Sequence, residues 1–510
     1  GINSGLTGVF NFRTGEVRIA SATALGNTGL LVFGNNTVLK SASAADYAIS
    51  RPVRLAGSVA LGEAATRTGT LTFEQNLDLG GAMRTLWVSN PVTKWVEIQG
   101  ALTNGGLTKS GPGLLILSGT NTYAGGTAVS VGTLQGNTDS LPGNIANNAA
   151  VTFHQAADGT YAGVMSGNGS LAKDGTGALT LSGSNTYNGI TMINEGVLWI
   201  PGYAGRSAFF VSSEAALLGT GTVGDLTIDG AVHPGAASNA VGTLTASNVY
   251  LAANGALRID LTQCTGAPGT NWDLLRAAGN LTVESTELTP FTVEVVGNPT
   301  GFNPTNTWSW KIIDADASEI NGFARIKFAT DSSGFVPDTS GGGFVVTEYS
   351  GDLYLEFLVP GISVLGAGDA TIADGDVTPA TADGTDFGDV SVGSAGVQVF
   401  TVTNTGGTEL TLNDVVIGGA DPGDFIVAAT NATTVSAGEV TTFTIAYSPS
   451  DLGTSAATVY LTNSIAASSP YTFALAGNGL IAAPTNLLVR NDGYEMIRLT
   501  RNKAAAFDVM

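Results

Sequence analysis

Short stretches of alternating apolar and polar residues, separated by glycine-rich turns, run through the first 358 residues of the chain. Leu115 and Leu117 alternate with variable positions, and Leu179 and Leu181 do the same. Alternation with a period of two is typical of a strand that has one face in a core. We therefore predict that these leucines point inward. No stretch sustains the 3.6-residue period of an amphipathic helix, so the pattern predicts an all-β protein.

One segment of the chain is repeated. Residues 107–134 recur at 171–198, and 15 of 28 positions match without a gap. Both copies contain glycines where the chain must turn sharply. Asn121 and Asn185 each follow a strand, where an asparagine can hydrogen-bond its own turn. We expect equivalent residues of the two copies to share one lateral position, with these asparagines at one corner about three coils apart.

The repeated unit is too short to bury its apolar face alone. Stacking successive units buries one continuous core. We therefore predict a β-solenoid over residues 1–358, with about 20–25 residues in each coil. A chain of β-sandwiches is the alternative, but the turns recur at a shorter and more regular spacing than sandwiches need.

The last third of the chain has a different pattern. An acidic segment of small residues at 366–376 is followed by renewed alternation. Seven or so short strands in about 95 residues suit a β-sandwich. The clearest are predicted at 397–403, 410–417, 441–447, 454–461 and 471–476. We place an acidic linker and this sandwich at 359–480, and the first strands of an incomplete further domain at 481–510.

The repeat resembles a known family. The motif Leu-x-Lys-x-Gly-x-Gly-x-Leu-x-Leu-Ser-Gly-x-Asn-Thr-Tyr-x-Gly-x-Thr, present from Leu107 and from Leu171, is similar to the autotransporter-associated β-strand repeat of bacterial passenger proteins. Segments 222–244 and 255–261 also resemble late passenger segments. The resemblance implies a right-handed parallel β-helix on the bacterial cell surface or outside the cell.

Two further resemblances concern the later domains. Residues 384–388, 400–406 and 443–449 are similar to the choice-of-anchor immunoglobulin-like domain of large bacterial surface proteins. Residues 483–489 and 495–500 resemble the first two strands of a fibronectin-type domain. The resemblances imply a β-helix at 1–358, an immunoglobulin-like sandwich within 359–480 and a partial fibronectin-type segment at 481–510.

Charge and composition narrow the function. The net charge of −21 argues against binding nucleic acid or an anionic membrane through a basic surface. Cys264 is the single cysteine, so an intrachain disulfide is impossible. No apolar run approaches the roughly 20 residues that span a bilayer, and we predict no transmembrane segment.

The sequence offers little for catalysis. His154 and His233 are the two histidines, and neither has a serine or aspartate partner in a recognisable motif. We expect them to be structural, on a coil surface and in a turn. Cys264 has no nearby base, and no nucleotide-binding fingerprint or zinc-ligand spacing occurs. We therefore predict no enzyme and no catalytic, cofactor-binding or metal-binding residue.

Two weaker chemical possibilities remain open. Many β-helices are polysaccharide lyases or glycosidases, which need clustered carboxylates. The candidates here are scattered along the sequence: Asp174, Glu195, Asp225 and Asp229. The acidic linker has enough oxygen ligands for Ca²⁺, but it lacks a calcium-loop spacing and also suits a solvated linker. Its carboxylates are Asp369, Asp374, Asp376, Asp383, Asp386 and Asp389.

Two functions are consistent with these features. One is a structural stalk, fibre or surface-layer component that associates with copies of itself, with the strands at its two ends as contacts. The other is an adhesin that binds glycans or proteins along the β-helix flank, which a ridge of exposed tryptophans would favour. The tryptophans are Trp87, Trp95, Trp199, Trp272, Trp308 and Trp310.

Overall fold

The structure is a computed structural model. It describes residues 7–481, except residues 22, 27, 65–67, 92, 237–239, 316–319, 340 and 431. The described residues form strands and four short 3-10 turns, which confirms the all-β class. They divide into two compact units. The first holds most residues before 356, and the second holds the later residues with the segments around 303–309 and 338–345.

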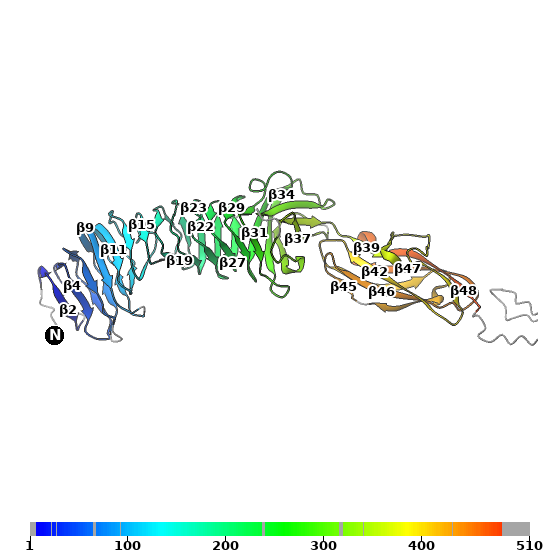
Figure 1. The fold of residues 1–510 in the computed structure, drawn as a ribbon, viewed down its shortest axis with the longest axis horizontal. Helices are drawn as coiled ribbons and strands as arrows, with labels where there is room; N and C mark the ends of the chain where they lie inside the picture. Colours follow the sequence, from blue (N-terminus) through cyan, green and yellow to red (C-terminus); the bar gives the residue numbers. More distant parts are fainter. Residues whose placement is uncertain are drawn as a thin grey trace, which may run out of the picture. The chain divides into compact units, whose positions relative to one another are not determined.

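The first unit is a β-helix whose strands stack coil upon coil (Figure 1). Up to β36, neighbouring strands pair in parallel, as a β-helix requires. Its strands belong to four sheets. The first sheet contains β1 (Phe10–Phe12), β2 (Gly15–Ile19), β3 (Leu31–Phe33), β4 (Thr37–Ser41), β6 (Val53–Leu55), β7 (Val59–Leu61), β9 (Leu77–Val88), β11 (Leu102–Ser110), β13 (Thr127–Val129), β15 (Ile145–Asn147) and β18 (Met165–Ser166). The second contains β5 (Tyr47–Ile49), β8 (Leu71–Phe73), β10 (Val96–Ile98), β12 (Leu114–Leu117), β14 (Thr133–Gly136), β16 (Ala150–His154), β19 (Ser170–Asp174), β21 (Thr191–Ile193), β24 (Phe209–Val211), β27 (Leu226–Ile228), β30 (Val249–Leu251) and β33 (Leu281–Val283).

The other two sheets of the β-helix begin later in the chain. The third contains β17 (Gly159–Tyr161), β20 (Ala178–Leu181), β22 (Gly196–Ile200), β25 (Ala215–Gly219), β28 (Ala231–Pro234), β31 (Ala256–Gln263), β34 (Phe291–Thr300) and β36 (Phe328–Phe335), which η1 (Arg325–Lys327) precedes. The fourth contains β23 (Tyr203–Ala204), β26 (Thr222–Val223), β29 (Thr243–Ala246), β32 (Leu274–Ala277), β35 (Trp308–Ala315), β37 (Gly343–Tyr349) and β38 (Asp352–Leu358). From β16 onward, a strand of the second sheet is followed along the chain by one of the third, as β19 is by β20.

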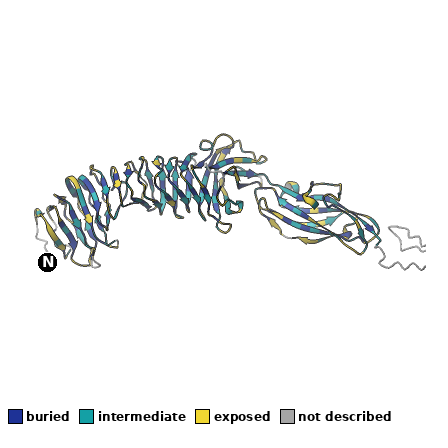
Figure 2. Cartoon of the chain, in the orientation of Figure 1, coloured by how far each residue is buried: buried dark blue, intermediate teal, exposed yellow. Residues whose placement is uncertain are grey.

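The core of the β-helix is made by the alternating residues. Leu115, Leu117, Leu179 and Leu181 are at most 1% exposed, which confirms that they point inward. Burial alternates along many strands of the stack, β12 and β20 among them (Figure 2). Val96, Leu115 and Leu134 are successive partners in the second sheet, so the coils in this part of the stack are slightly shorter than expected.

The two copies of the repeat do not occupy the same face, so the prediction of a shared lateral position is wrong. Leu115 belongs to the second sheet, whereas its counterpart Leu179 belongs to the third. Three ladder steps from Leu115 lead to Leu171, the first leucine of the second copy. The second copy therefore lies three coils further along the β-helix than the first, and its strands are shifted by one side of the coil. Accordingly, the strands after Asn121 and Asn185 belong to different sheets.

The repeated asparagines connect coils. Asn121 accepts a hydrogen bond from the backbone N–H of Leu102 through Oδ1 at 2.6 Å, and Asn185 accepts one from Met165 at 2.8 Å. Both side chains are buried. Asn185 also donates through Nδ2 to the backbone oxygen of Gly183, which is in its own turn as expected, whereas both Oδ1 atoms bond the preceding coil. They supply a partner for an amide where the strand ladder is interrupted.

The repeated lysines are buried as well. Lys109 Nζ donates to the backbone oxygens of Ser110, Gly111 and Val131 at 2.8–3.1 Å. Lys173 Nζ makes the equivalent bonds to Asp174, Gly175 and Glu195. Both lysine side chains are fully buried, and burial lowers the pKa of Lys109 to about 8. The glycine beside each has a positive φ, 75° at Gly111 and 81° at Gly175, which turns its carbonyl toward the ammonium group.

The second unit is a β-sandwich of two five-stranded sheets. One sheet contains β39 (Ile362–Leu365), β40 (Thr371–Ile372), β42 (Gly396–Asn404), β44 (Phe425–Thr430) and β46 (Val440–Tyr447). The other contains β41 (Asp386–Ser391), β43 (Leu410–Gly418), β45 (Thr434–Val435), β47 (Gly453–Asn463) and β48 (Tyr471–Leu480). Three 3-10 turns, η2 (Ala367–Asp369), η3 (Pro422–Asp424) and η4 (Ala466–Ser468), connect strands. Aromatic residues from both sheets fill the core, among them Phe400, Phe443 and Phe473.

The five clearest predicted strands of the sandwich are confirmed, but the acidic segment is more than a linker. Residues 371–372 form β40, and Ile372 is fully buried in the sandwich core. Alternation was too short there to reveal a strand. The partial fibronectin-type segment at 481–510 lies outside the described residues after Ile481. In the described part of the chain, no helix is long and apolar enough to cross a membrane.

Candidate functional site

Two of the carboxylates considered for glycosidic chemistry accept hydrogen bonds from asparagines of the following coil. Asp174 accepts a hydrogen bond from Asn194, and Asp225 accepts one from Asn248. Each contact links two exposed or half-buried side chains at a coil surface. His154 lies on β16 opposite Asp174 in the ladder and is exposed, as expected for a coil-surface residue. Cys264 is buried, which raises the pKa of its thiol to about 11 and makes it a poor nucleophile.

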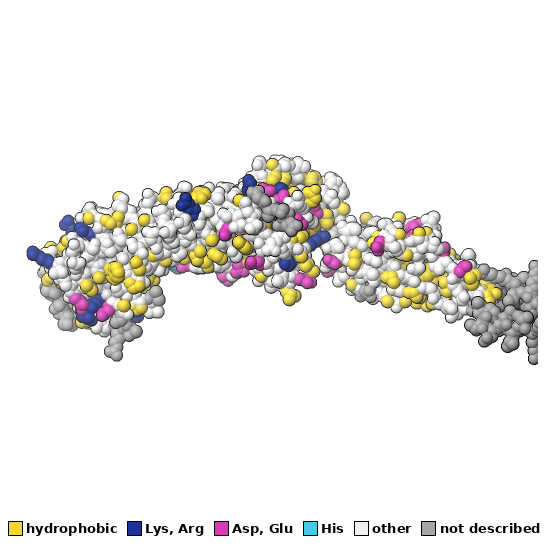
Figure 3. All heavy atoms as spheres, viewed as in Figure 1, with side chains coloured by type: hydrophobic (Ala, Val, Ile, Leu, Met, Phe, Trp, Pro, Cys, Tyr) yellow, Lys and Arg dark blue, Asp and Glu magenta, His cyan; other side chains and the backbone are white. Residues whose placement is uncertain are grey.

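The six tryptophans do not form a ridge. Trp272 and Trp310 are buried, and Trp95, Trp199 and Trp308 are half-buried. Trp87 is 48% exposed, on the same face of β9 as the exposed Met83. The face of the chain in Figure 3 is largely uncharged, with acidic and basic side chains in small groups.

Carboxylates of the predicted linker accept hydrogen bonds from nearby threonines. Asp376 Oδ1 accepts from the backbone N–H and the hydroxyl of Thr378, and Asp383 Oδ1 does the same from Thr385. Asp374 accepts the backbone N–H of Thr472. These bonds fix turns of the sandwich. Calcium binding at this segment stays a prediction.

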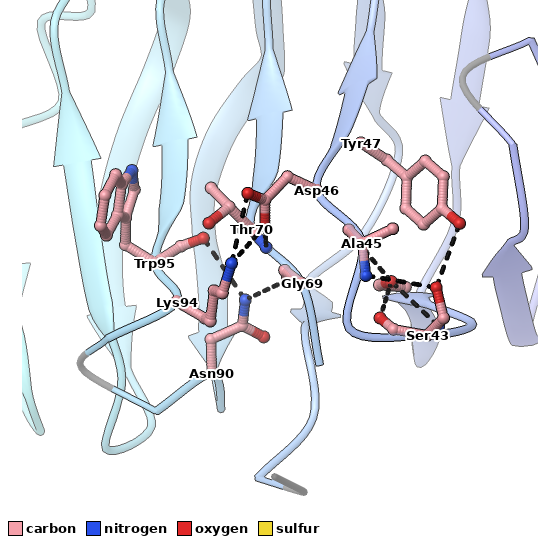
Figure 4. Close-up of polar contacts among 10 residues, drawn as sticks. Ser43, Ala45, Asp46, Tyr47, Gly69, Thr70, Asn90, Lys94 and Trp95 are labelled. Carbon is pink, nitrogen blue, oxygen red and sulfur yellow. Dashed lines mark hydrogen bonds and ion pairs between the residues drawn. The ribbon is translucent and has the colours of Figure 1, made fainter. Parts of the chain in front are cut away.

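A polar corner joins three early coils of the β-helix (Figure 4). Asp46 accepts hydrogen bonds from the backbone N–H of Thr70 at 2.7 Å and from Lys94 Nζ at 2.9 Å. These bonds lower the pKa of Asp46. The buried Asn90 donates to the backbone oxygens of Gly69 and Trp95. All of these groups have partners within the corner, so we interpret it as a tie between coils.

The most unusual polar cluster contains His233, one of the two histidines. It lies on β28, in register with Leu218 of the preceding coil, on the outer side of the third sheet. Asp260 comes from β31 of the next coil, and Asp273 directly precedes β32. His233 Nε2 is 2.8 Å from Asp260 Oδ2 and 3.5 Å from Asp273 Oδ2. All three side chains are buried, with exposures of 6%, 2% and 0%.

Further donors hold the two carboxylates of this cluster. Arg258 donates to Asp260 Oδ1 through Nε and Nη2, both at 3.1 Å. Asp273 Oδ1 accepts the backbone N–H of Gly242 at 2.8 Å, and its Oδ2 accepts that of Asp260 at 2.9 Å. Each carboxylate is therefore fixed by its own donors and also faces the imidazole.

The charges of the cluster shift its pKa values. Burial alone would lower the pKa of His233, but hydrogen bonds to Asp260 and Asp273, and their charges, raise it to about 9. Burial opposes ionisation of Asp260 too, but His233 and Arg258 outweigh it and lower the pKa. For Asp273, burial is the stronger influence and raises the pKa. At neutral pH the cluster thus holds a buried imidazolium beside the ionised Asp260.

We expect His233 to contribute up to about 3 kcal/mol to the unfolding free energy, and this contribution is lost as pH rises from about 6.5 to above 9. A histidine with a raised folded pKa contributes stability that is complete below its unfolded pKa of about 6.5. That contribution is lost as pH rises through the folded value of about 9. Urea denaturation in EDTA at several pH values measures the loss. His154→Gln should keep this loss and His233→Gln should lack it, so the difference between the two variants measures the contribution of His233; equal slopes in the two variants would contradict the prediction.

This cluster was not predicted from the sequence, where His233 was placed in a turn as a structural residue. Its members are far apart along the chain, in coils of unequal length. Only the actual register brings them together. Within the described residues, this is the one group of at least three histidine, cysteine or acidic side chains whose ligand atoms all lie within 4.8 Å of one another.

Two family models match the chain. Residues 107–135 and 171–200 match the passenger-associated-transport repeat. These coils are passenger-associated-transport repeats. Residues 380–478 match the Ig-like domain of HYDIN/CFA65/VesB-like proteins, which confirms the immunoglobulin-like class of the sandwich. The resemblance to autotransporter passengers is thereby confirmed, and the chain is an extracellular or cell-surface protein.

Curated relatives match short parts of the repeat protein. The chain is 35% identical over 124 residues to the adhesin BmaC autotransporter of Brucella suis. This match covers 23% of the chain and 4% of the adhesin. The chain is 38% identical over 95 residues to an extracellular serine protease of Serratia marcescens, covering 18% of this chain and 9% of the protease. The chain thus spans less than a tenth of either relative.

Solved structures with local likeness include two proteins of Vibrio cholerae. The secreted serine protease VesC is 19% identical, with 20% of this chain and 22% of VesC covered at a TM-score of 0.17. The VesB protease is 14% identical, with 26% of this chain and 41% of VesB covered, also at a TM-score of 0.17.

Proposed function

We propose that the chain is a structural, non-catalytic part of a bacterial surface protein, a stalk that carries the immunoglobulin-like domain. The continuous parallel ladder and core of the β-helix support this most directly. Leu115, Leu134, Val151 and Leu171 stack in consecutive coils and are at most 1% exposed. Such a stack resists opening at any one coil because each coil shares its hydrogen bonds and apolar contacts with both neighbours.

The cluster around His233 also supports a non-catalytic function. In the described part of the chain, the hydrogen bonds of this imidazole go to Asp260 and Asp273. A general base in acyl transfer has to reach a nucleophilic hydroxyl or thiol. Here both carboxylates face the same ring nitrogen, Nε2, so the contacts of this nitrogen are with anions and not with a nucleophile.

Incubation of the purified chain with casein and with acidic polysaccharides tests this proposal. We expect no product above a buffer blank for either substrate. Turnover that disappears in His233→Gln, or in a variant with one acidic residue changed to its amide, would overturn the proposal.

Sedimentation velocity over a range of concentrations tests the self-association that we attribute to the stalk, with a concentration-dependent rise in mass as the expected result. A constant monomer mass would contradict the proposed self-association but not the structural, non-catalytic function.

Adhesion is the second candidate, because one relative is named an adhesin. The exposed pair Met83 and Trp87 on β9 offers an apolar surface for a sugar ring or an apolar side chain. Binding of the chain to a glycan array, lost in Trp87→Ala and kept in Trp310→Phe, would favour adhesion over a purely structural role.

A further inference from the structure

We propose that His233, Asp260 and Asp273 bind one divalent transition-metal ion of the zinc class on the outer side of the third sheet. This goes beyond the stalk function, which does not require a metal. The geometry is the first reason. Three separate segments, from β28, β31 and the turn before β32, bring one imidazole nitrogen and two carboxylate oxygens within 4.8 Å of one another.

The second reason is how the carboxylates are oriented. Arg258 holds Oδ1 of Asp260, and the backbone N–H of Gly242 holds Oδ1 of Asp273. Oδ2 of each carboxylate is the atom that faces His233 Nε2. Ligating carboxylates in metal sites are themselves hydrogen-bonded in this way, which fixes the oxygen that faces the ion. Oδ2 of Asp273 also accepts the N–H of Asp260, and a carboxylate oxygen has a second lone pair for a metal.

The donor set selects the class of metal. Imidazole nitrogen with carboxylate oxygen suits Zn²⁺ and its neighbours, whereas Ca²⁺ takes six to eight oxygens and Mg²⁺ keeps several waters. Bonds of about 2.0–2.2 Å around a tetrahedral ion separate ligand atoms by about 3.4 Å. The distance from His233 to Asp273, 3.5 Å, already matches this value. The distance from His233 to Asp260, 2.8 Å, must lengthen by about 0.6 Å.

Metal binding replaces the charge of the imidazolium with that of the metal ion. The imidazolium proton leaves to solvent, and the freed lone pair of Nε2 forms the bond to the metal. The dication then becomes the positive partner of both carboxylates. Space next to the ring is kept by a glycine, since a Cβ on Gly235 would lie 3.4 Å from Nε2 and 2.1 Å from the backbone oxygen of Ala240. A side chain at this position would therefore crowd the ion.

Zinc chloride titrated into the EDTA-treated chain is the direct test. We expect one zinc per chain by elemental analysis after gel filtration, with binding weakened about 100-fold or more in His233→Gln and in Asp260→Asn. His154→Gln is the matched control and should bind as the natural chain does. Equal zinc content in the His233→Gln and natural chains would overturn the proposal, as would no retained zinc in the natural chain.

Two measurements on the natural chain guard against variants that fail to fold. Co²⁺ in place of zinc should give the visible absorption bands of a tetrahedral site with nitrogen and oxygen ligands. With two histidines in the chain, imidazole NMR resolves both rings, and zinc should shift the signals of His233 and leave those of His154. Absence of the bands together with unmoved His233 signals would disprove the site.

Discussion

Replacing Lys109 with methionine should destabilise the β-helix by about 3 kcal/mol or more. The methionine fills similar space but leaves the backbone oxygens of Ser110, Gly111 and Val131 without the ammonium donor. The bonds to Ser110 and Gly111 are buried, and the bond to Val131 is partly buried. Each buried acceptor that loses its partner costs about 1–3 kcal/mol. Because coils of a solenoid can open locally, hydrogen exchange over residues 107–135 should be measured together with urea denaturation.

Lys94→Met is the matched control for this prediction. Lys94 pairs with Asp46 at the coil surface, where both side chains are partly exposed. Exposed ion pairs contribute about 0–1 kcal/mol, so this variant should differ little from the natural chain. If the two lysine variants lose the same stability, the buried bonds of Lys109 do not have the role assigned to them. Lys173→Met should behave like Lys109→Met, since its three bonds are equivalent.

Replacing Leu181 with alanine should lower the unfolding free energy of the surrounding coils by about 2–5 kcal/mol. Leu181 is fully buried and pairs in register with Tyr161 of the preceding coil. Its neighbours are held by ladders on both sides, so they cannot collapse into the cavity that alanine leaves. Urea denaturation measures the effect.

Thr180→Ala is the control for the leucine variant. Thr180 is the adjacent residue on the same strand, points to the outer side and is only half-buried. We expect its loss to change the stability by less than about 0.5 kcal/mol. A leucine variant as stable as this control would mean that the core of the β-helix can repack around alanine.

These two variants show which part of the fold the sequence reveals. Alternation identified Leu181 as a core residue because period-two burial leaves a direct trace in the residue types. Lys109 left no such trace, because lysine is ordinarily a surface residue. Lys109 lies on the same inward face of β11 as Leu107, in register with the buried Val129, and the turn at Gly111 provides one of the carbonyls that accept from its ammonium group. The motif contained the lysine in both copies, and this repetition was the available signal.

The candidate metal site was harder to predict for a different reason. His233, Asp260 and Asp273 belong to coils of unequal length, so no fixed spacing relates them. Their meeting depends on the register between β25, β28 and β31. The sandwich shows the same limit on a smaller scale, since β40 has only two residues and no readable alternation.

The offset between the two repeats affects what the solenoid displays. The block that separates the start of one copy from the start of the next does not hold a whole number of turns, and the leucines of the motif are buried on two different sides of the coil. One sequence motif can therefore occupy more than one side of the coil and still bury its leucines. An antibody raised against the outer residues of the motif would find its two epitopes on different sides of the β-helix, facing different directions.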